Sequence, residues 1–190
     1  MKVDLNKYIK VYSSFFEKEL CNNTIKDLKN CEKEWYEHTF YNPLTNTNKN
    51  RSGEQEFSVS ELYTENHKII MDKLWNGIKN YVDYLDIPFF NSWSGYSIAR
   101  YNIYRENKKM AEHIDHIQSI FDGERKGIPT LSLVGILNDD YEGGEFIMFG
   151  KEEIKLKQGD LLIFPSNFLF KHKVNEVKKG TRYSFVSWVW

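Results

Sequence analysis

The sequence predicts an α+β fold in which N-terminal helices support a double-stranded β-helix, or jelly roll, of about eight strands. Two segments of the first half have helical spacing, and short β-rich runs fill the chain from Tyr96 onward. A length of 190 residues, 41% of them hydrophobic, allows one sizeable core but not two ordinary domains. We therefore expect a single domain over residues 1–190, with mainly helical support in 1–90 and a jelly-roll catalytic core in 96–190.

The two helical segments are recognised by their apolar spacing and by residues that favour helix N-termini. Residues 22–24 (Asn-Asn-Thr) offer N-caps to the first segment, and residues 58–61 (Ser-Val-Ser-Glu) form a possible capping box before the second. Residues 44–56 between them are polar and rich in asparagine, so we expect a flexible loop there, with a lid as the alternative. The apolar positions of the two segments are Ile25, Leu28, Cys31 and Trp35, and then Leu62, Ile69, Ile70, Leu74, Ile78 and Leu85.

The second half alternates short β-rich runs with turn sequences. The turns are NDDYEGGE, FGKE, KQGD and VKKG. Many short strands in a compact region are typical of a jelly roll, and we expect the helices to cover one of its outer faces. The runs are residues 96–105, 111–117, 130–138, 145–149, 153–157, 161–165, 168–174 and 181–190.

A metal site is predicted at residues 113–116, which read His-Ile-Asp-His in a chain with five histidines. Side chains alternate between the faces of a strand, so His113 and Asp115 share one face and His116 lies on the other. His172 is the only histidine in a later predicted strand, and it supplies a third ligand. Two imidazoles and one carboxylate form the facial triad that binds non-haem Fe(II). The alternative is a set of unrelated surface or core histidines.

The last run, residues 181–190, adds a second signal. Strand alternation places Arg182, Ser184, Val186 and Trp188 on one face. An arginine that points into a cavity is costly unless it meets an anion, and its planar fork suits a carboxylate. A dicarboxylate that chelates Fe(II) at one end and pairs with Arg182 at the other satisfies both conditions, and 2-oxoglutarate is such a ligand.

These motifs resemble the 2-oxoglutarate- and Fe(II)-dependent dioxygenases, specifically the prolyl 4-hydroxylase-like branch. The matching stretches are ARYNIYRENKKMAEHIDH, LVGILNDDYEGGEFIMF, KQGDLLIFPSNFLFKHKV and GTRYSFVSW. They extend from about residue 98 to residue 190 in the family's order and spacing. The first half matches only as the helical support that these enzymes usually have.

The resemblance implies roles for individual residues. It makes His113, Asp115 and His172 the iron ligands of the catalytic centre. Arg182 then pairs with the distal carboxylate of 2-oxoglutarate, and Tyr104, nine residues before the first ligand, hydrogen-bonds the same cosubstrate. The implied reaction consumes O2, hydroxylates an unactivated C–H bond and releases succinate and CO2.

Further site residues are expected beside these. Ser184 shares the strand face of Arg182, so we expect it to contact the cosubstrate as well. The resemblance places Trp188 near the substrate. Plant-type prolyl hydroxylases have a substrate-contacting arginine just before the third strand, where this chain has Ile-Pro-Thr at residues 128–130, with Arg125 nearby as a candidate.

Two departures from the family pattern leave the substrate open. Asn107 and Met110 stand where family members often have a glycine and a second tyrosine. We expect hydroxylation of proline in a protein or peptide. A free amino acid or another small molecule is the alternative substrate, and a jelly-roll metal-binding module without turnover is the alternative function.

Composition limits the other partners. The formal net charge of −1 gives no global attraction to nucleic acids or anionic membranes, and no basic stripe is present. No apolar run approaches the ~20 residues that span a bilayer. The cysteines Cys21 and Cys31 lie in a predicted helix, and the N-terminal residues do not resemble a secretion signal. We therefore expect a cytoplasmic protein that binds neither nucleic acid nor membrane.

Overall fold

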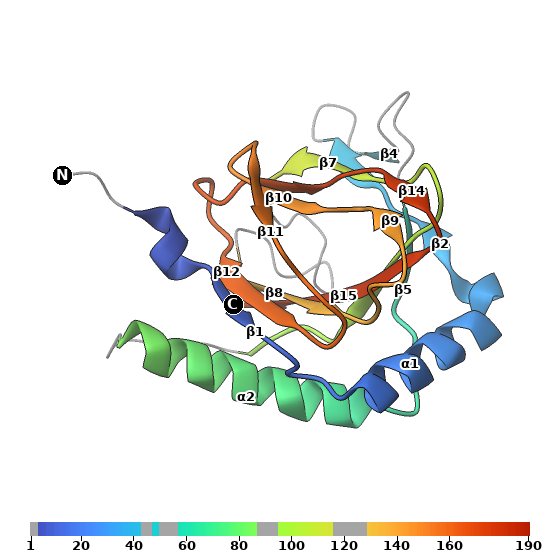
Figure 1. Cartoon of the computed structure of the whole chain (residues 1–190), viewed down its shortest axis with the longest axis horizontal. Helices are drawn as coiled ribbons and strands as arrows, with labels where there is room; N and C mark the ends of the chain where they lie inside the picture. The colour runs from blue at the N-terminus through green and yellow to red at the C-terminus, as the bar shows by residue number, and fades with distance from the viewer. Residues whose placement is uncertain (1–3, 43–46, 50–56, 87–94, 116–128) are drawn as a thin grey trace.

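The helices and sheets are stacked in layers (Figure 1). The structure is a computed structural model, and it describes residues 4–42, 47–49, 57–86, 95–115 and 129–190. Helices α1 (Lys18–Asn30) and α2 (His67–Leu85) cover one face of the larger sheet, and a smaller sheet lies over its other face. Within these described ranges, no helix is both long and apolar enough to cross a membrane.

The two main sheets consist of short antiparallel strands. The larger sheet has the order β1 (Lys10–Tyr12), β12 (Leu161–Pro165), β8 (Leu131–Ile136), β15 (Arg182–Val189), β6 (Arg100–Tyr104), β5 (Ser58–Ser60) and β2 (Tyr36–Glu37). The smaller sheet has the order β11 (Glu152–Ile154), β10 (Phe146–Met148), β13 (His172–Val174) and β7 (Met110–His113).

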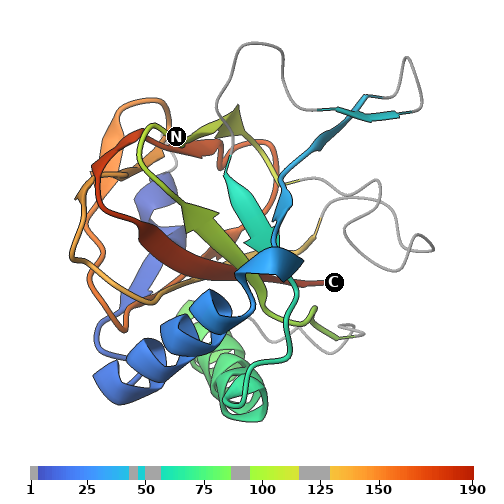
Figure 2. The ribbon, with the colours of Figure 1, turned by 90° about the vertical axis from the view of Figure 1, so that its right-hand side faces the viewer.

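The remaining elements are short. Strand β9 (Glu142–Gly143) pairs with β14 (Val177–Lys179), and β3 (Phe40–Asn42) pairs with β4 (Thr47–Lys49). Seen from the side, the β3–β4 hairpin extends away from the two sheets (Figure 2). Short 3₁₀ helices occupy Leu5–Tyr8 and Glu32–Glu34.

Strand alternation divides the buried apolar side chains into two layers. In β12, Leu161 and Ile163 belong to the layer beneath the helices, whereas Leu162 and Phe164 belong to the layer between the sheets. Strand β15 repeats this pattern, with Phe185 against the helical layer. The face of each strand that points away from the helices therefore lines the space between the two sheets, where the candidate site lies.

Helix α2 packs closely on the larger sheet because of a glycine. A Cβ atom at Gly77 would lie 2.6 Å from Leu161 Cδ2, so a larger residue would force the Leu161 side chain or the helix to shift. Ile70, Leu74 and Ile78 of the same helix are fully buried at this contact. The burial of this apolar stripe explains why the predicted amphipathic segment folds as a helix.

The predicted jelly roll is confirmed. The fold is mostly antiparallel, each of the eight predicted runs overlaps a strand, and the helices cover one outer face as expected. The turn sequences NDDYEGGE and VKKG, however, contain β9 and β14, which pair with each other.

The predicted helix starts are wrong. Helix α1 begins at Lys18, so residues 22–24 lie inside it, and Thr24 Oγ1 donates a hydrogen bond to Leu20 O over 2.8 Å. Ser58–Ser60 forms β5 rather than a capping box, and α2 begins at His67. Pairing of β5 with β6 and complete burial of Val59 outweigh the local capping signal.

The first half contributes more than helices. Strands β1, β2 and β5 all join the larger sheet, so residues 1–90 also build its two edges. In the predicted loop of residues 44–56, Thr47–Lys49 forms β4 instead of irregular chain. The rest of that loop, and with it the lid alternative, lies outside the described residues.

Candidate metal centre and cosubstrate site

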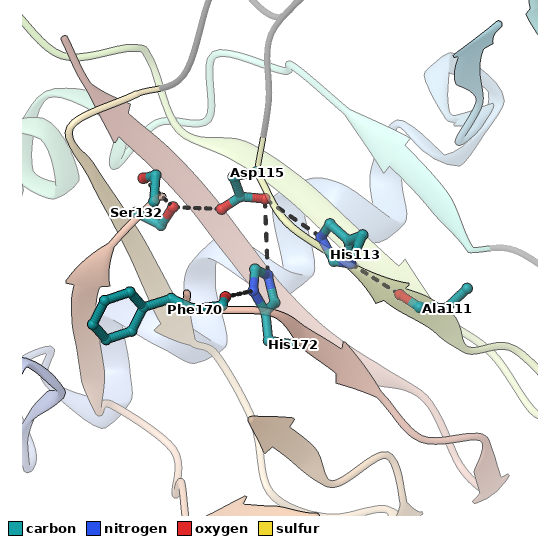
Figure 3. Close-up of polar contacts among 7 residues, drawn as sticks. Ala111, His113, Asp115, Ser132, Phe170 and His172 are labelled. Atoms are coloured by element: carbon teal, nitrogen blue, oxygen red, sulfur yellow. Dashed lines mark hydrogen bonds and ion pairs between the residues drawn. The ribbon is translucent and has the colours of Figure 1, made fainter. Parts of the chain in front are cut away.

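Two histidines of the smaller sheet face the same point. His172 of β13 and His113 of β7 are register partners, which brings their ring centres to 4.3 Å. Asp115 follows two residues after the end of β7, and its Oδ1 lies 3.4 Å from His113 Nε2 and 3.8 Å from His172 Nε2. Figure 3 shows the three side chains converging. The structure thus brings together the three residues that the sequence singled out.

Backbone carbonyls orient both imidazole rings. His113 Nδ1 lies 2.9 Å from Ala111 O, and His172 Nδ1 lies 3.0 Å from Phe170 O (Figure 3). A carbonyl oxygen can only accept a hydrogen bond, so each Nδ1 is the donor and has the ring proton. The lone pair of each Nε2 is then available to a metal ion.

A buried serine pair holds the carboxylate. Ser132 Oγ of β8 donates a hydrogen bond to Asp115 Oδ2 and lies 2.7 Å from Ser166 Oγ. Both serines are 1% exposed, so water does not compete for these contacts. The bond to Oδ2 directs the other oxygen of Asp115, Oδ1, toward the two histidines.

The protonation states suit metal binding. Burial lowers the pKa of His172 to about 4, and the charge of His113 acts in the same direction. The rings of Phe146 and Phe164, 5.2 and 5.0 Å from that of His172, account for the burial. Burial alone would raise the pKa of Asp115, but the interactions with His172 and His113 and the hydrogen bond from Ser132 outweigh it and hold the pKa below its ordinary value. Neutral imidazole and ionised carboxylate are the forms that bind metals.

The geometry of this cluster permits a shared metal ion. The candidate ligand atoms of His113, Asp115 and His172 all lie within 4.8 Å of one another. Two imidazoles and one carboxylate on one side of an ion leave further coordination positions free for other ligands. The donor set therefore fits Fe(II).

Arg182 lies in the same cavity between the sheets. Its side chain is buried, its Nη1 donates to Ser184 Oγ over 2.7 Å, and its Nε has no hydrogen-bond partner. The guanidinium lies 5.1 Å from the ring centre of Tyr104, its register partner in β6. A buried cation with an unpaired N–H fits a ligand carboxylate, and this supports 2-oxoglutarate as the second group held here.

The cavity also contains the other described residues that the sequence predicted. Tyr104 stacks on Phe57 with ring centres 4.3 Å apart, and Trp188 is 4% exposed. Arg125 and His116 lie outside the described residues. The cavity is lined by Phe57, Arg100, Asn102, Tyr104, Met110, His113, Asp115, Ser132, Val134, Phe146, His172, Val174, Arg182, Ser184, Val186 and Trp188.

The two departures from the family pattern have structural counterparts. Asn107 adopts a φ of 63°, a left-handed conformation that asparagine tolerates better than most residues, so it replaces a glycine without loss of the turn. Met110 is buried and lines the cavity. It therefore presents an apolar thioether where a tyrosine would present a hydroxyl group.

Sequence reasoning missed Arg100, Ser132 and Ser166. Arg100 and Ser132 both line the cavity. The alternation rule would have found them, because Arg100 shares a strand face with Tyr104 and Ser132 shares one with Val134. Ser166 follows the end of β12, and its contact with Ser132 depends on the pairing of β12 with β8.

A facial His–Asp–His cluster and a buried arginine inside a jelly roll define the class of non-haem iron proteins that bind a dicarboxylate cosubstrate. Residues 96–190 match the family model described as the 2OG-Fe(II) oxygenase superfamily. The match covers half of the chain, and the chain belongs to this superfamily. Its cofactors are Fe(II) and 2-oxoglutarate, with O2 as the co-reactant.

Curated relatives match the same region. The PKHD-type hydroxylase of Idiomarina loihiensis is 37% identical over 92 residues, which are 46% of this chain and 39% of that protein. The PKHD-type hydroxylase of Pseudomonas putida is 37% identical over 93 residues, or 46% of this chain and 40% of that protein. The chain thus spans about two fifths of the length of these relatives.

Solved structures share the whole fold at low identity. The viral collagen prolyl hydroxylase of Paramecium Bursaria Chlorella virus-1, in its 2OG complex, gives a TM-score of 0.68 at 16% identity and covers 96% of this chain and 95% of that one. A prolyl hydroxylase of Trichoplax adhaerens, in complex with a hypoxia inducible factor peptide, gives 0.72 at 14% identity, with 98% and 85% covered. The described jelly roll is therefore the fold of prolyl hydroxylases.

Proposed function

We propose that this protein is an Fe(II)- and 2-oxoglutarate-dependent dioxygenase that hydroxylates proline within a protein or peptide. The observation that supports this most strongly is the presence of the His113, Asp115 and His172 cluster and the unpaired Nε of Arg182 in one buried cavity. A metal site that only stores or stabilises has no need of a buried cation facing it, so Arg182 argues against a module without turnover.

The proposal assigns the binding of iron to three side chains. His113 and His172 bind through Nε2, because their Nδ1 atoms are engaged with carbonyls, and Asp115 binds through Oδ1, because Ser132 holds Oδ2. Bound iron, 2-oxoglutarate and O2 together supply the oxidising power for C–H hydroxylation, with succinate and CO2 as co-products. The chain contributes the orientation of these groups.

Arg182 and its neighbours bind the cosubstrate in this proposal. Arg182 pairs with the distal carboxylate of 2-oxoglutarate, Ser184 fixes the guanidinium through Nη1, and the guanidinium lies over the Tyr104 ring. The apolar side chains of Met110, Val174 and others around them limit water in the cavity, which strengthens the charge pair.

The assignment of proline in a peptide as the substrate is supported by the relatives and by an aromatic residue of the cavity. The curated relatives are named PKHD-type hydroxylases, and the Trichoplax adhaerens enzyme of the same fold is in complex with a peptide fragment. Trp188 offers an aromatic wall in the cavity, and a proline in polyproline II conformation is already ordered and loses little entropy on such a surface.

In the test, the protein is incubated in parallel with proline-containing peptides, with proteins of a host lysate and with free L-proline, each in the presence of Fe(II), 2-oxoglutarate and O2. We expect succinate release coupled to the mass gain of one oxygen atom in a peptide or protein, and no such gain with His172→Ala. Coupled turnover only with free proline or another metabolite would contradict the peptidyl substrate and keep the oxygenase. Failure to form succinate with any substrate would contradict both.

A further inference from the structure

A second arginine lies on the cavity wall and has no assigned role. Arg100 begins β6, where it pairs with Val186 of β15, whereas Arg182 pairs with Tyr104 at the other end of the same ladder. The two arginines are thus four residues apart along the ladder, or roughly 13 Å. Both line the cavity that contains the metal cluster.

The Arg100 guanidinium is held in place but not neutralised. It lies 4.9 Å from the ring centre of Trp188, and its Nε is inaccessible to solvent and has no hydrogen-bond partner. Burial lowers the pKa of Arg100, and electrostatic interactions with Tyr36, Tyr104, Asp115 and Glu61 oppose this only partly. No carboxylate of the described ranges forms an ion pair with it.

Arg100 as a whole is only partly buried, but its Nε is closed to solvent without an acceptor. Such an unpaired N–H is unfavourable, and the contact with Trp188 compensates only part of the cost. Arg105, near the other end of β6, shows the ordinary arrangement, because it lies over Trp35 and also forms an ion pair with Glu32. The distal carboxylate of 2-oxoglutarate is assigned to Arg182, so it does not account for Arg100. The remaining ligand that enters this cavity is the substrate.

We propose that Arg100 binds a carboxylate of the substrate, with Trp188 stacked beneath the guanidinium to fix its plane. This inference rests on the proposed hydroxylase function and narrows its substrate to an anionic one. The carboxylate has two possible sources: the α-carboxylate of free proline, or an acidic side chain next to a proline in a peptide. A guanidinium binds both in the same bidentate manner.

The experiment measures binding by calorimetry to the full chain loaded with Mn(II) and 2-oxoglutarate. The first pair of probes is L-proline and L-prolinamide, and the second is a blocked Pro-Glu peptide and its Pro-Gln counterpart. We expect the carboxylate member of at least one pair to bind about tenfold tighter or more than its amide. The pair that shows this preference identifies the source of the carboxylate.

Variants test whether Arg100 is responsible. Arg100→Met keeps a long side chain over Trp188 and should abolish the preference for the carboxylate while leaving the affinity for 2-oxoglutarate unchanged. Arg100→Lys should retain part of the preference, because it keeps the charge without the fork. Arg105→Met is the matched control, since it removes an arginine from an aromatic face outside the cavity, and it should change neither affinity.

Equal binding of carboxylate and amide in both pairs would overturn the inference, as would a preference that survives Arg100→Met. Loss of 2-oxoglutarate affinity in Arg100→Met would also overturn it and assign Arg100 to the cosubstrate. Succinate release, measured with the same probes on protein loaded with Fe(II) instead of Mn(II) and supplied with O2, separates the two claims. A carboxylate preference without succinate refutes the hydroxylase alone, and succinate without the preference refutes the role of Arg100 alone.

Discussion

Replacement of Ser132 by alanine tests whether its hydrogen bond prepares Asp115 for metal binding. The variant leaves Asp115 Oδ2 without its donor and removes the partner of Ser166 Oγ, both in a region closed to water. Loss of such a contact behind a metal ligand typically costs 10–100-fold in affinity, or about 1.4–2.7 kcal/mol. We therefore expect Ser132→Ala to bind a divalent metal ion about 10–100-fold more weakly than the unchanged protein.

The assay is a titration of the metal-free protein with Mn(II), in which the electron paramagnetic resonance signal reports the free ion. Ser187→Ala is the matched control, because Ser187 is also fully buried and donates a hydrogen bond, to Ser97 O over 2.6 Å, but does not line the cavity. It should destabilise the fold without weakening metal binding. Ser132→Thr keeps the hydroxyl group and should restore most of the affinity.

Two results would refute the reasoning. Wild-type Mn(II) affinity in Ser132→Ala would mean that Asp115 is oriented by the backbone alone. An equal loss of affinity in Ser187→Ala would mean that the effect follows from general loosening of the sheets rather than from the bond to Oδ2.

Three further predictions concern the same cavity. His113→Ala and His172→Ala should abolish Mn(II) binding and succinate formation, whereas His116→Ala should keep both; the reverse pattern would contradict the alternation argument. Arg182→Ala should weaken 2-oxoglutarate binding, measured by calorimetry with Mn(II), by about 2–5 kcal/mol, and Arg182→Lys should recover only part of this loss. An unchanged affinity in Arg182→Ala would contradict the assignment of Arg182 to the distal carboxylate. The burial that lowers the pKa of His172 from 6.5 to about 4 favours the neutral ring in the folded state. The metal-free protein should therefore lose roughly 3 kcal/mol of unfolding free energy as the pH falls from 6.5 to 4, because only the unfolded chain takes up the proton there, and denaturant titrations of His172→Gln should lack this loss.

Alternation along single strands was the most reliable part of the sequence prediction. Arg182, Ser184, Val186 and Trp188 were placed on one face, and all line the cavity. In a sheet that is buried on both faces, a one-residue shift of a strand's register would move all of its apolar side chains to the opposite face, so the register is strongly specified. The assignment of iron and cosubstrate roles to these residues stays a prediction, as does the single domain over residues 1–190.

The geometry between strands could not be predicted in the same way. His172 and His113 are neighbours because β13 pairs with β7 in one particular register, and no local pattern specifies that register. Asp115 points correctly even though β7 ends at His113, so the expected strand was too long while its direction was right. Here Ser132 of a different sheet completes the orientation.

Local signals failed where tertiary pairing opposed them. Residues 58–61 have the composition of a capping box, yet Val59 and Phe57, which precedes this segment, are buried among the side chains between the sheets. Burial of two large apolar groups stabilises the strand by several times the ~1 kcal/mol that a helix cap contributes. A sequence window has no information about the strand β6 that makes this burial possible.

Arg100, the first residue of β6, and Arg105, the residue that follows its end, show why residue type alone does not reveal a binding group. Arg100 and Arg105 belong to the same short stretch of chain, and each lies over a tryptophan ring. Arg105 is exposed and paired with Glu32, so its charge is already satisfied. Arg100 is paired with no described carboxylate, because the alternation of β6 turns it into the cavity beside Trp188. The position of each side chain relative to the sheet, rather than its chemistry, therefore decides which arginine is free to bind a ligand.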